Sequence, residues 1–366
     1  MSRVDPPLPD APLVPGWANR TALLVGLVAV VQVAFIWSYV AALHQPDPEG
    51  VPLGVVAPAE VLSTLQREVG AATGTVELVA VADADTAHAE VVDGTLAGSV
   101  VVGGTGPTTD LLIVTEVPSL AYENLFREVL DHLDAQLAAA DPSSVRSYTV
   151  TTVNPFAPGD PQGLTPFYLA VGWVVGGYLL LAFLGFTQRR ADGWDGMGRR
   201  LLLLVGYAIV SGAGGALVVG PLLGIFDDHV LQLAVFGAAL SLAVTTTVQA
   251  MEVLAGPVYG IGLAVVAYVV VGNPAAGGPF PRSFLPGFWD AVGAWLPPGM
   301  GVDGIRAIEY DTAGLGAATG RIVAYVTVGL AVSLASVAIT ERRAARPGLV
   351  GTRRSSTGRV PVTSSV

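Results

Sequence analysis

The sequence contains no cysteine and no lysine, and all 18 of its basic residues are arginine. Without cysteine, the chain can form neither disulfide bonds nor thiolate metal sites. Without lysine, it cannot contain the G-x-x-x-x-G-K-[ST] loop that holds ATP phosphates, so ATP hydrolysis by a P-loop is excluded. The glycine run 103–106 is better explained as a hairpin turn.

Charge is also scarce, because only 13% of the residues are charged and 52% are hydrophobic. Soluble domains average about 25% charged residues. The charged residues are missing from a few long windows rather than evenly, which is typical of a chain embedded in a lipid bilayer. We therefore predict a multi-pass α-helical membrane protein.

Six uncharged windows are long enough to cross a hydrocarbon core of about 30 Å as helices. They are Thr21–Leu43, Pro166–Thr187, Leu201–Phe226, Val230–Met251, Val253–Gly272 and Ile322–Thr340. Only Glu252 separates the fourth window from the fifth, and Gly256 and Pro257 follow it, which predicts a tight helical hairpin there. Pro221 predicts a kink in the third span.

The first window has an alternative interpretation as a cleavable signal peptide, since Ala41-Ala42 offers small residues for cleavage. Its apolar stretch is longer than the usual 7–15 residues of such a peptide, which favours a retained signal-anchor helix.

The placement of arginine predicts the orientation of the spans. The short segment 188–200 contains four arginines, and the segment 342–366 contains six arginines and no acid. Positively charged short loops and tails lie in the cytoplasm. We therefore expect a plasma-membrane protein with both termini in the cytoplasm. The segment 44–164, with 3 Arg against 17 Asp and Glu, would lie outside.

The segment 44–164 is long enough to form a domain. Short strand-like runs predict strands at 53–57, 76–82, 99–102, 111–115 and 146–153. The sequence also predicts three helices: one that starts near residue 61, one over 86–96, and a longer one over 119–139. Strands that alternate with helices imply a small α/β layer structure. The predicted organisation is an N-terminal tail (1–20), a first helix (21–43), an extracytoplasmic α/β domain (44–164), a five-helix bundle (165–341) and a disordered basic tail (342–366).

Between the fifth and sixth spans, the segment 273–320 is rich in aromatic residues, proline and glycine. Tryptophan and other aromatic side chains gather at membrane–water interfaces. We predict short interfacial or re-entrant helices on the outer face, with Phe280, Phe284, Phe288, Trp289 and Trp295 in the interface.

Three sets of residues are candidates for function. Polar residues inside the spans either line a substrate path or form hydrogen bonds between helices. Small residues at four-residue spacing predict close helix packing, within the chain or across a homodimer. The basic loop either contacts a partner ATPase or contacts anionic lipid and sets the topology. The polar residues inside the spans are Gln32, Ser241, Thr245, Thr246, Thr247 and Gln249. The small residues are Gly212, Ala216, Gly220, Gly224, Gly256 and Gly260. The candidates in the basic loop are Arg189, Arg190, Trp194, Arg199 and Arg200.

Asp227-Asp228-His229 lies in an outer turn and offers oxygen and imidazole ligands to a divalent cation. A solvated turn explains it better, because a metal ion needs more ligands than these three residues supply. No arrangement of serine, histidine and acid suggests a catalytic site, so we expect neither an enzyme nor a cofactor, and the acidic net charge of −11 argues against nucleic acid as a partner.

Three stretches of the sequence carry a family resemblance. They are Ser38–His44 leading to Pro52–Val56, Val92–Val101, and the two Leu-Pro motifs at Leu285–Trp289 and Leu296–Pro298 followed by Val302, Asp303 and Arg306. These stretches resemble the permeases of type 2 ABC exporters, and more closely their Pip-like (phage-infection-protein-like) branch. The resemblance implies a dimeric exporter subunit that moves an apolar or amphipathic substrate outward with a separate ATPase. The alternative is a non-transporting envelope protein whose acidic outer domain binds a surface partner.

Overall fold

The computed structural model describes residues 17–43, 48–72, 75–106, 108–140, 146–187 and 193–344. Among them, five helical segments are long and apolar enough to cross a membrane. Two of them contain π-helical stretches, η2 in the second and η3 in the fourth. The helices are α5 (Thr165–Thr187), α6 (Gly193–Leu217) with η2 (Val218–Leu222), α7 (Val230–Ala255), α8 (Pro257–Ala264) with η3 (Val265–Gly272) and α9 (Asn273–Ala275), and α12 (Leu315–Ala344).

The first predicted span corresponds to helix α1 (Trp17–Leu43). The apolar helix recognised within it, Ala29–Leu43, is shorter than the five segments above. Helix α1 packs on η3 and α9, where Ala42 is buried against Ala275, Leu285 and Trp289. The second to sixth predicted spans are thus confirmed, and the first span, Thr21–Leu43, stays a prediction. The tails 1–16 and 345–366 lie outside the described residues.

Two local features of the bundle follow directly from the sequence. The predicted hairpin between α7 and α8 turns at Gly256, whose φ of +86° is a backbone conformation that side chains other than glycine rarely adopt. The predicted kink at Pro221 lies inside η2, where Gly220 leaves helical geometry. The helix consequently ends at Leu222, four residues before the predicted end of the window.

The N-terminal domain is a mixed five-stranded sheet with strand order β2-β1-β3-β4-β5. Only the β3–β4 pair is antiparallel, because a short turn joins these strands, whereas helices connect the parallel neighbours. The elements are β1 (Val51–Val56), α2 (Ala59–Ala72), β2 (Val76–Ala80), α3 (Ala84–Val92), β3 (Gly98–Gly106), β4 (Thr109–Thr115), α4 (Ala121–Ala140) and β5 (Ser147–Val153).

Alternation along the strands gives the sheet two apolar faces. On one face, Val100, Leu112 and Val114 pack with Phe126 of α4, and α2 lies on the same side. On the other face, Val101 and Ile113 pack with Val91 of α3. The predicted α/β layer structure is confirmed.

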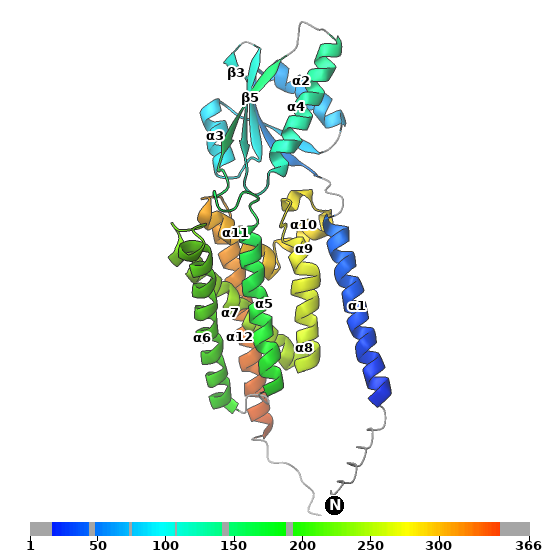
Figure 1. The fold of residues 1–366 in the computed structure, drawn as a ribbon, viewed down its shortest axis with the longest axis vertical. Coiled ribbons are helices and arrows are strands. Elements are labelled where there is room, and N and C mark those ends of the chain that lie inside the picture. Colours follow the sequence, from blue (N-terminus) through cyan, green and yellow to red (C-terminus); the bar gives the residue numbers. More distant parts are fainter. Residues whose placement is uncertain are drawn as a thin grey trace, which may run out of the picture.

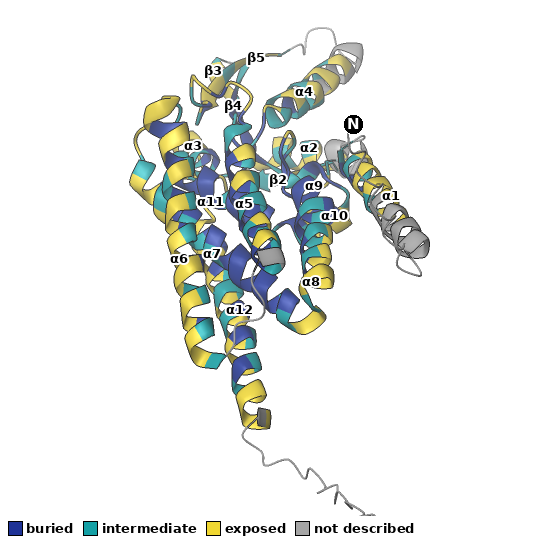
Figure 2. Ribbon diagram, turned by 60° about the horizontal axis from the view of Figure 1, so that its bottom comes forward, coloured by how far each residue is buried: buried dark blue, intermediate teal, exposed yellow. Residues whose placement is uncertain are grey.

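The segment after α9 contains three further short helices: η4 (Arg282–Phe284), α10 (Gly287–Gly293) and α11 (Pro297–Glu309). Helix α11 is buried at 11 of its 13 residues and packs against α5, α7 and α12. Figure 1 shows the α/β domain above this segment at one end of the bundle, with the start of α1 and the end of α12 at the opposite end. Figure 2 shows the exposed outer surfaces of α6 and the buried residues that line the bundle interior.

The prediction for the aromatic residues of this segment is partly wrong. Phe284 is buried in the core of the α/β domain, and Phe280 packs against the same core. Phe288 and Trp295 remain more than 60% exposed, as expected of residues in the interface. The sequence pattern does not separate the two groups, because an aromatic residue at an interface and one in a domain core are equally apolar.

Candidate functional site

A cavity of about 490 Å³ lies between the α/β domain and the adjacent end of the helical bundle. We call it the interdomain cavity. Its domain side is formed by the starts of β1 and α4 and by the segments 94–97 and 115–118; its bundle side is formed by 281–283, α10, α11 and the first turns of α12. Ligand sites are usually between about 300 and 1,000 Å³, so the cavity is large enough for a small molecule or a headgroup.

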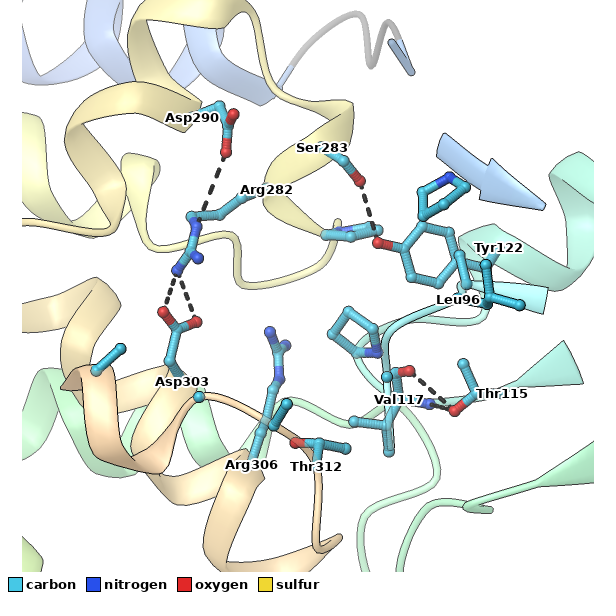
Figure 3. A pocket seen from close by; sticks show the side chains of 18 of the residues that line it. Leu96, Thr115, Val117, Tyr122, Arg282, Ser283, Asp290, Asp303, Arg306 and Thr312 are labelled. Atoms are coloured by element: carbon cyan, nitrogen blue, oxygen red, sulfur yellow. Dashed lines mark hydrogen bonds and ion pairs between the residues drawn. The ribbon is translucent and has the colours of Figure 1, made fainter. Parts of the chain in front are cut away.

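Arg282 and Asp303 form the main ion pair of the cavity (Figure 3). Nη1 of Arg282 donates to both carboxylate oxygens of Asp303, at 2.6 and 2.5 Å. A second carboxylate, that of Asp290, lies 3.9 Å from Nε of Arg282. Asp303 is therefore already neutralised by a charge from a neighbouring segment.

Arg306 lies one turn after Asp303 on α11 and is only 7% exposed. Its one hydrogen bond runs from Nη2 to the carbonyl oxygen of Gly277 at 3.5 Å, and its Nε has no partner among the described residues. Figure 3 shows the guanidinium directed into the cavity. Burial lowers the pKa of Arg306 to about 10, so the side chain keeps its positive charge at neutral pH.

Arg321, from α12, adds a third arginine to the cavity. It donates to the carbonyl oxygen of Ala294 at 3.0 Å and stacks over the ring of Trp295 at 4.9 Å. Among the described residues, neither Arg306 nor Arg321 forms an ion pair with an acid. The cavity thus presents three arginines against two aspartates, although the segment 44–164 above it is strongly acidic.

Several contacts hold the α/β domain against this end of the bundle. The Tyr122 hydroxyl lies 3.1 Å from the Ser283 hydroxyl, and Ser119 donates to the carbonyl oxygen of Pro279 at 3.0 Å. On the opposite side, the backbone N–H of Ala313 donates to the carbonyl oxygen of Asp93 at 2.8 Å. Burial raises the pKa of Tyr122, so it acts here as a neutral hydroxyl.

No local sequence pattern predicts this cavity. Asp303 and Arg306 stand out in the sequence only as part of the stretch that resembles exporter permeases, and no local pattern distinguishes Arg282 or Arg321. The one available signal is the occurrence of isolated arginines in the apolar segment 273–321, away from the arginine-rich segments 188–200 and 342–366. The contacts themselves join residues about 160 positions apart, and no local pattern encodes them.

The polar residues predicted for a substrate path are separated by the structure. Gln32 is exposed on α1, whereas the five residues of α7 are buried inside the bundle. Three of those five bond across helices: Ser241 to Ser211, Thr247 to Tyr268, and Gln249 to Arg200. Thr245 and Thr246 instead donate to the carbonyl oxygen of Leu242 on their own helix. None of the six lines the interdomain cavity as the described residues form it.

Most of the small residues do pack helices closely, and they do so within this chain. A Cβ on Gly212 would lie 2.3 Å from the backbone of Ala234 and Ala238 on α7. Ala216 is fully buried, Gly220 faces Val230, and Gly260 faces the backbone of Glu252. Gly224 and Gly256 are not part of a packing face, because both lie in turns with positive φ; that part of the prediction is wrong.

The basic loop is only partly described, since Arg189 and Arg190 lie outside the described residues. Helix α6 starts at Gly193, and Trp194 (49% exposed) and Arg199 are on its surface. Arg200 points inward, where it pairs with Glu252 at 2.7 Å and donates to Gln249 at 2.9 Å. Arg200 is thus engaged in the bundle, while Trp194 and Arg199 are accessible.

The turn with Asp227, Asp228 and His229 faces the end of α11. His229 Nδ1 lies 3.6 Å from a carboxylate oxygen of Glu309. The described residues contain no group of three or more potential metal ligands.

A second cavity, of about 390 Å³, lies within the α/β domain between the sheet, α2 and α4. Its walls are mainly apolar, including Leu53, Val100 and Val129, and an ion pair between Arg146 and Asp110 lies at its edge.

The fold and the cavities define a multi-helical membrane protein with a mixed α/β domain on one end of its bundle. Over 176 residues, the chain is 28% identical to the uncharacterized protein YhgE of Bacillus subtilis (strain 168). The alignment covers 46% of this chain but only 21% of that protein, so the chain matches about a fifth of its relative's length. No family model and no solved structure matches the chain.

Proposed function

We propose that this chain is the membrane subunit of an ABC-type exporter, which moves an apolar or amphipathic substrate outward with energy from a separate ATPase subunit. The observation that carries the proposal is the docking of the α/β domain onto the buried helix α11 around the interdomain cavity. A ligand site at the outer end of a helical bundle is where a substrate would leave the membrane.

Two further observations support the proposal. The chain has no lysine and therefore no P-loop, so ATP-driven transport requires another subunit. At the end of the bundle away from the α/β domain, Trp194 and Arg199 are exposed in the first turns of α6. An exposed tryptophan beside arginines is a favourable anchor for a protein partner. We expect two copies of the chain in the assembled exporter.

Purification of the full chain from its native membrane in mild detergent tests this proposal. We expect an ATPase subunit to co-purify, and deletion of the chain to reduce efflux of an amphipathic compound. The double variant Trp194→Ala, Arg199→Glu should lose the ATPase. Arg67→Glu, which makes the same charge change on the exposed surface of the α/β domain, should retain it. If no ATPase accompanies the wild-type chain and no efflux changes, the exporter proposal is wrong.

The cavity inside the α/β domain favours a second candidate, an envelope protein whose outer domain binds a surface partner. Its apolar walls between α2 and α4 are suited to a short apolar side chain or lipid tail. A partner captured by the domain in the absence of any ATPase would support this candidate over the exporter.

A further inference from the structure

We infer that the interdomain cavity binds the anionic headgroup of an amphipathic molecule, with the Arg306 guanidinium as its principal contact. The inference concerns binding; that the bound molecule is the cargo rests on the proposed function.

The first step of the argument is the missing counter-charge of Arg306. A buried arginine is costly unless an acid and hydrogen-bond acceptors compensate it. Arg306 is 7% exposed, forms no ion pair with a described residue and has a single long hydrogen bond. Asp303, the acid on its helix that interacts electrostatically with Arg306, is already held by Arg282 through two hydrogen bonds. An external anion would supply the acceptor oxygens that the described residues do not.

The second step is the set of donors around Arg306. Arg321, Ala317 in the first turn of α12, and Gly314 directly before that helix line the same cavity. The first turn of this 30-residue helix contains no acid, and the N-terminus of a helix favours negative charge. The hydroxyl of Tyr122, on the domain side, lies 3.1 Å from that of Ser283, on the bundle side, and one of the two keeps a proton free for a ligand. Arginine, helix N-terminus and hydroxyl together are suited to phosphate or carboxylate oxygens.

The third step concerns the origin of the anion. The segment 44–164 has 3 Arg against 17 acids, and a field of that sign repels free anions that approach from water. A molecule held in the bilayer avoids this barrier. The exposed Trp295, over which Arg321 stacks, indicates that the bundle wall of the cavity lies near the level of lipid headgroups. Leu96, Val117 and Pro118 provide apolar surface for the rest of an amphiphile.

Binding of soluble probes to the full-length protein in detergent tests the inference. The probes are dihexanoyl phosphatidate, dihexanoyl phosphatidylcholine and inorganic phosphate, and the measurement is isothermal titration calorimetry. We expect the phosphatidate to bind about tenfold or more tightly than the phosphatidylcholine. Its phosphate monoester carries up to two negative charges for the arginines, whereas the phosphate of phosphatidylcholine is accompanied by a choline cation that the arginines repel. Inorganic phosphate should bind more weakly than the phosphatidate.

Arg306→Gln should remove the preference for the phosphatidate, and Arg306→Lys should restore part of it. Arg127→Gln changes a partly exposed arginine on α4 outside the cavity and should bind like the wild type. If Arg306→Gln fails to fold, Arg321→Gln is the second variant, and we expect it to weaken phosphatidate binding severalfold.

Three results would overturn the inference: equal binding of the phosphatidate and the phosphatidylcholine, an unchanged preference in Arg306→Gln, or inorganic phosphate as tight a ligand as the phosphatidate. The last result would make the site one for free anions. The assay needs no ATPase. Headgroup binding without a co-purifying ATPase would leave the inference in place and contradict the exporter proposal. A co-purifying ATPase without headgroup binding would leave the exporter proposal in place and contradict the inference.

Discussion

Arg306 is buried and the Arg200 side chain is only 10% exposed, but the chain compensates these two arginines differently. Arg200, on α6, pairs with Glu252 and donates to Gln249, both on α7. Arg306 lies at the interdomain cavity and has no ion-pair partner among the described residues. The first arginine therefore connects two helices, whereas the second leaves a positive charge available inside a cavity.

The Arg200–Glu252 pair gives a prediction for stability. Arg200→Ala leaves the Glu252 carboxylate buried and unpaired, and we expect a loss of about 3–5 kcal/mol in the free energy of unfolding. The double variant Arg200→Met, Glu252→Met should recover most of that loss, because it removes both charges. Thermal unfolding in detergent, followed by circular dichroism, measures both. A single variant as stable as the wild type would show that the pair contributes nothing to holding α6 against α7.

Arg306 gives the opposite prediction. In ligand-free protein, Arg306→Gln removes a buried charge that forms no ion pair with any described residue, so we expect the unfolding temperature to stay unchanged or to rise. The same unfolding assay checks this expectation, with Arg200→Gln as the matched change at a paired arginine. A large loss of stability in Arg306→Gln would mean that Arg306 is already compensated within the fold.

At the scale of elements, close approach between α6 and α7 depends on Gly212. A Cβ at this position would lie 2.3 Å from the carbonyl oxygen of Ala234 and the amide nitrogen of Ala238. We predict that Gly212→Ala forces the helices apart and costs about 1–3 kcal/mol in the free energy of unfolding.

Gly206 on the same helix is the matched control, because nothing lies within 4 Å of its Cβ position. Gly206→Ala should be neutral or more stable by up to about 1 kcal/mol, since alanine is the better helix former. Equal unfolding temperatures for the two variants would contradict the proposed helix contact.

The elements were predictable to the extent that their signals are local. The short strand-like run Leu111–Thr115 and the helical spacing from Tyr122 to Leu137 correctly predict β4 and α4. The α7–α8 turn was predictable because Glu252 interrupts the apolar run and Gly256 and Pro257, which favour turns, follow it. What was not predictable depends on distant partners: Phe284 joins the domain core only because α4 lies above it.

The same distinction applies to the candidate site. The small residues that pack α6 on α7 repeat along one helix and were found from their spacing. The interdomain cavity combines β1, α4, α11 and α12, and its charge balance depends on which arginine reaches which aspartate. Arg282 and Asp303 are 21 residues apart in different elements, so no local pattern predicts that they pair. Because Asp303 pairs with Arg282, Arg306 has no ion-pair partner among the described residues.

At the scale of the whole molecule, the α/β domain and the bundle form a joined unit. Besides the chain connections, the domain contacts the bundle on both sides of the cavity, through Ser119 and Tyr122 on one side and Asp93 on the other. The ring of Tyr310, at the end of α11, packs against Phe156 beside the returning connector. Helix α11 and the α/β domain are therefore in direct contact through the end of the helix.

The orientation of this unit is testable because the chain contains no cysteine, so each introduced thiol is a unique label site. His88 is exposed on α3 of the α/β domain, and Asp195 is exposed in the first turn of α6 at the other end of the bundle. Arginine-rich short segments remain in the cytoplasm, and Asp195 lies beside four such arginines. In intact cells, a membrane-impermeant maleimide should label His88→Cys but not Asp195→Cys, which should react only after permeabilisation. The unmodified chain is the blank, and labelling of Asp195→Cys from outside would reverse the orientation and place the interdomain cavity on the cytoplasmic side.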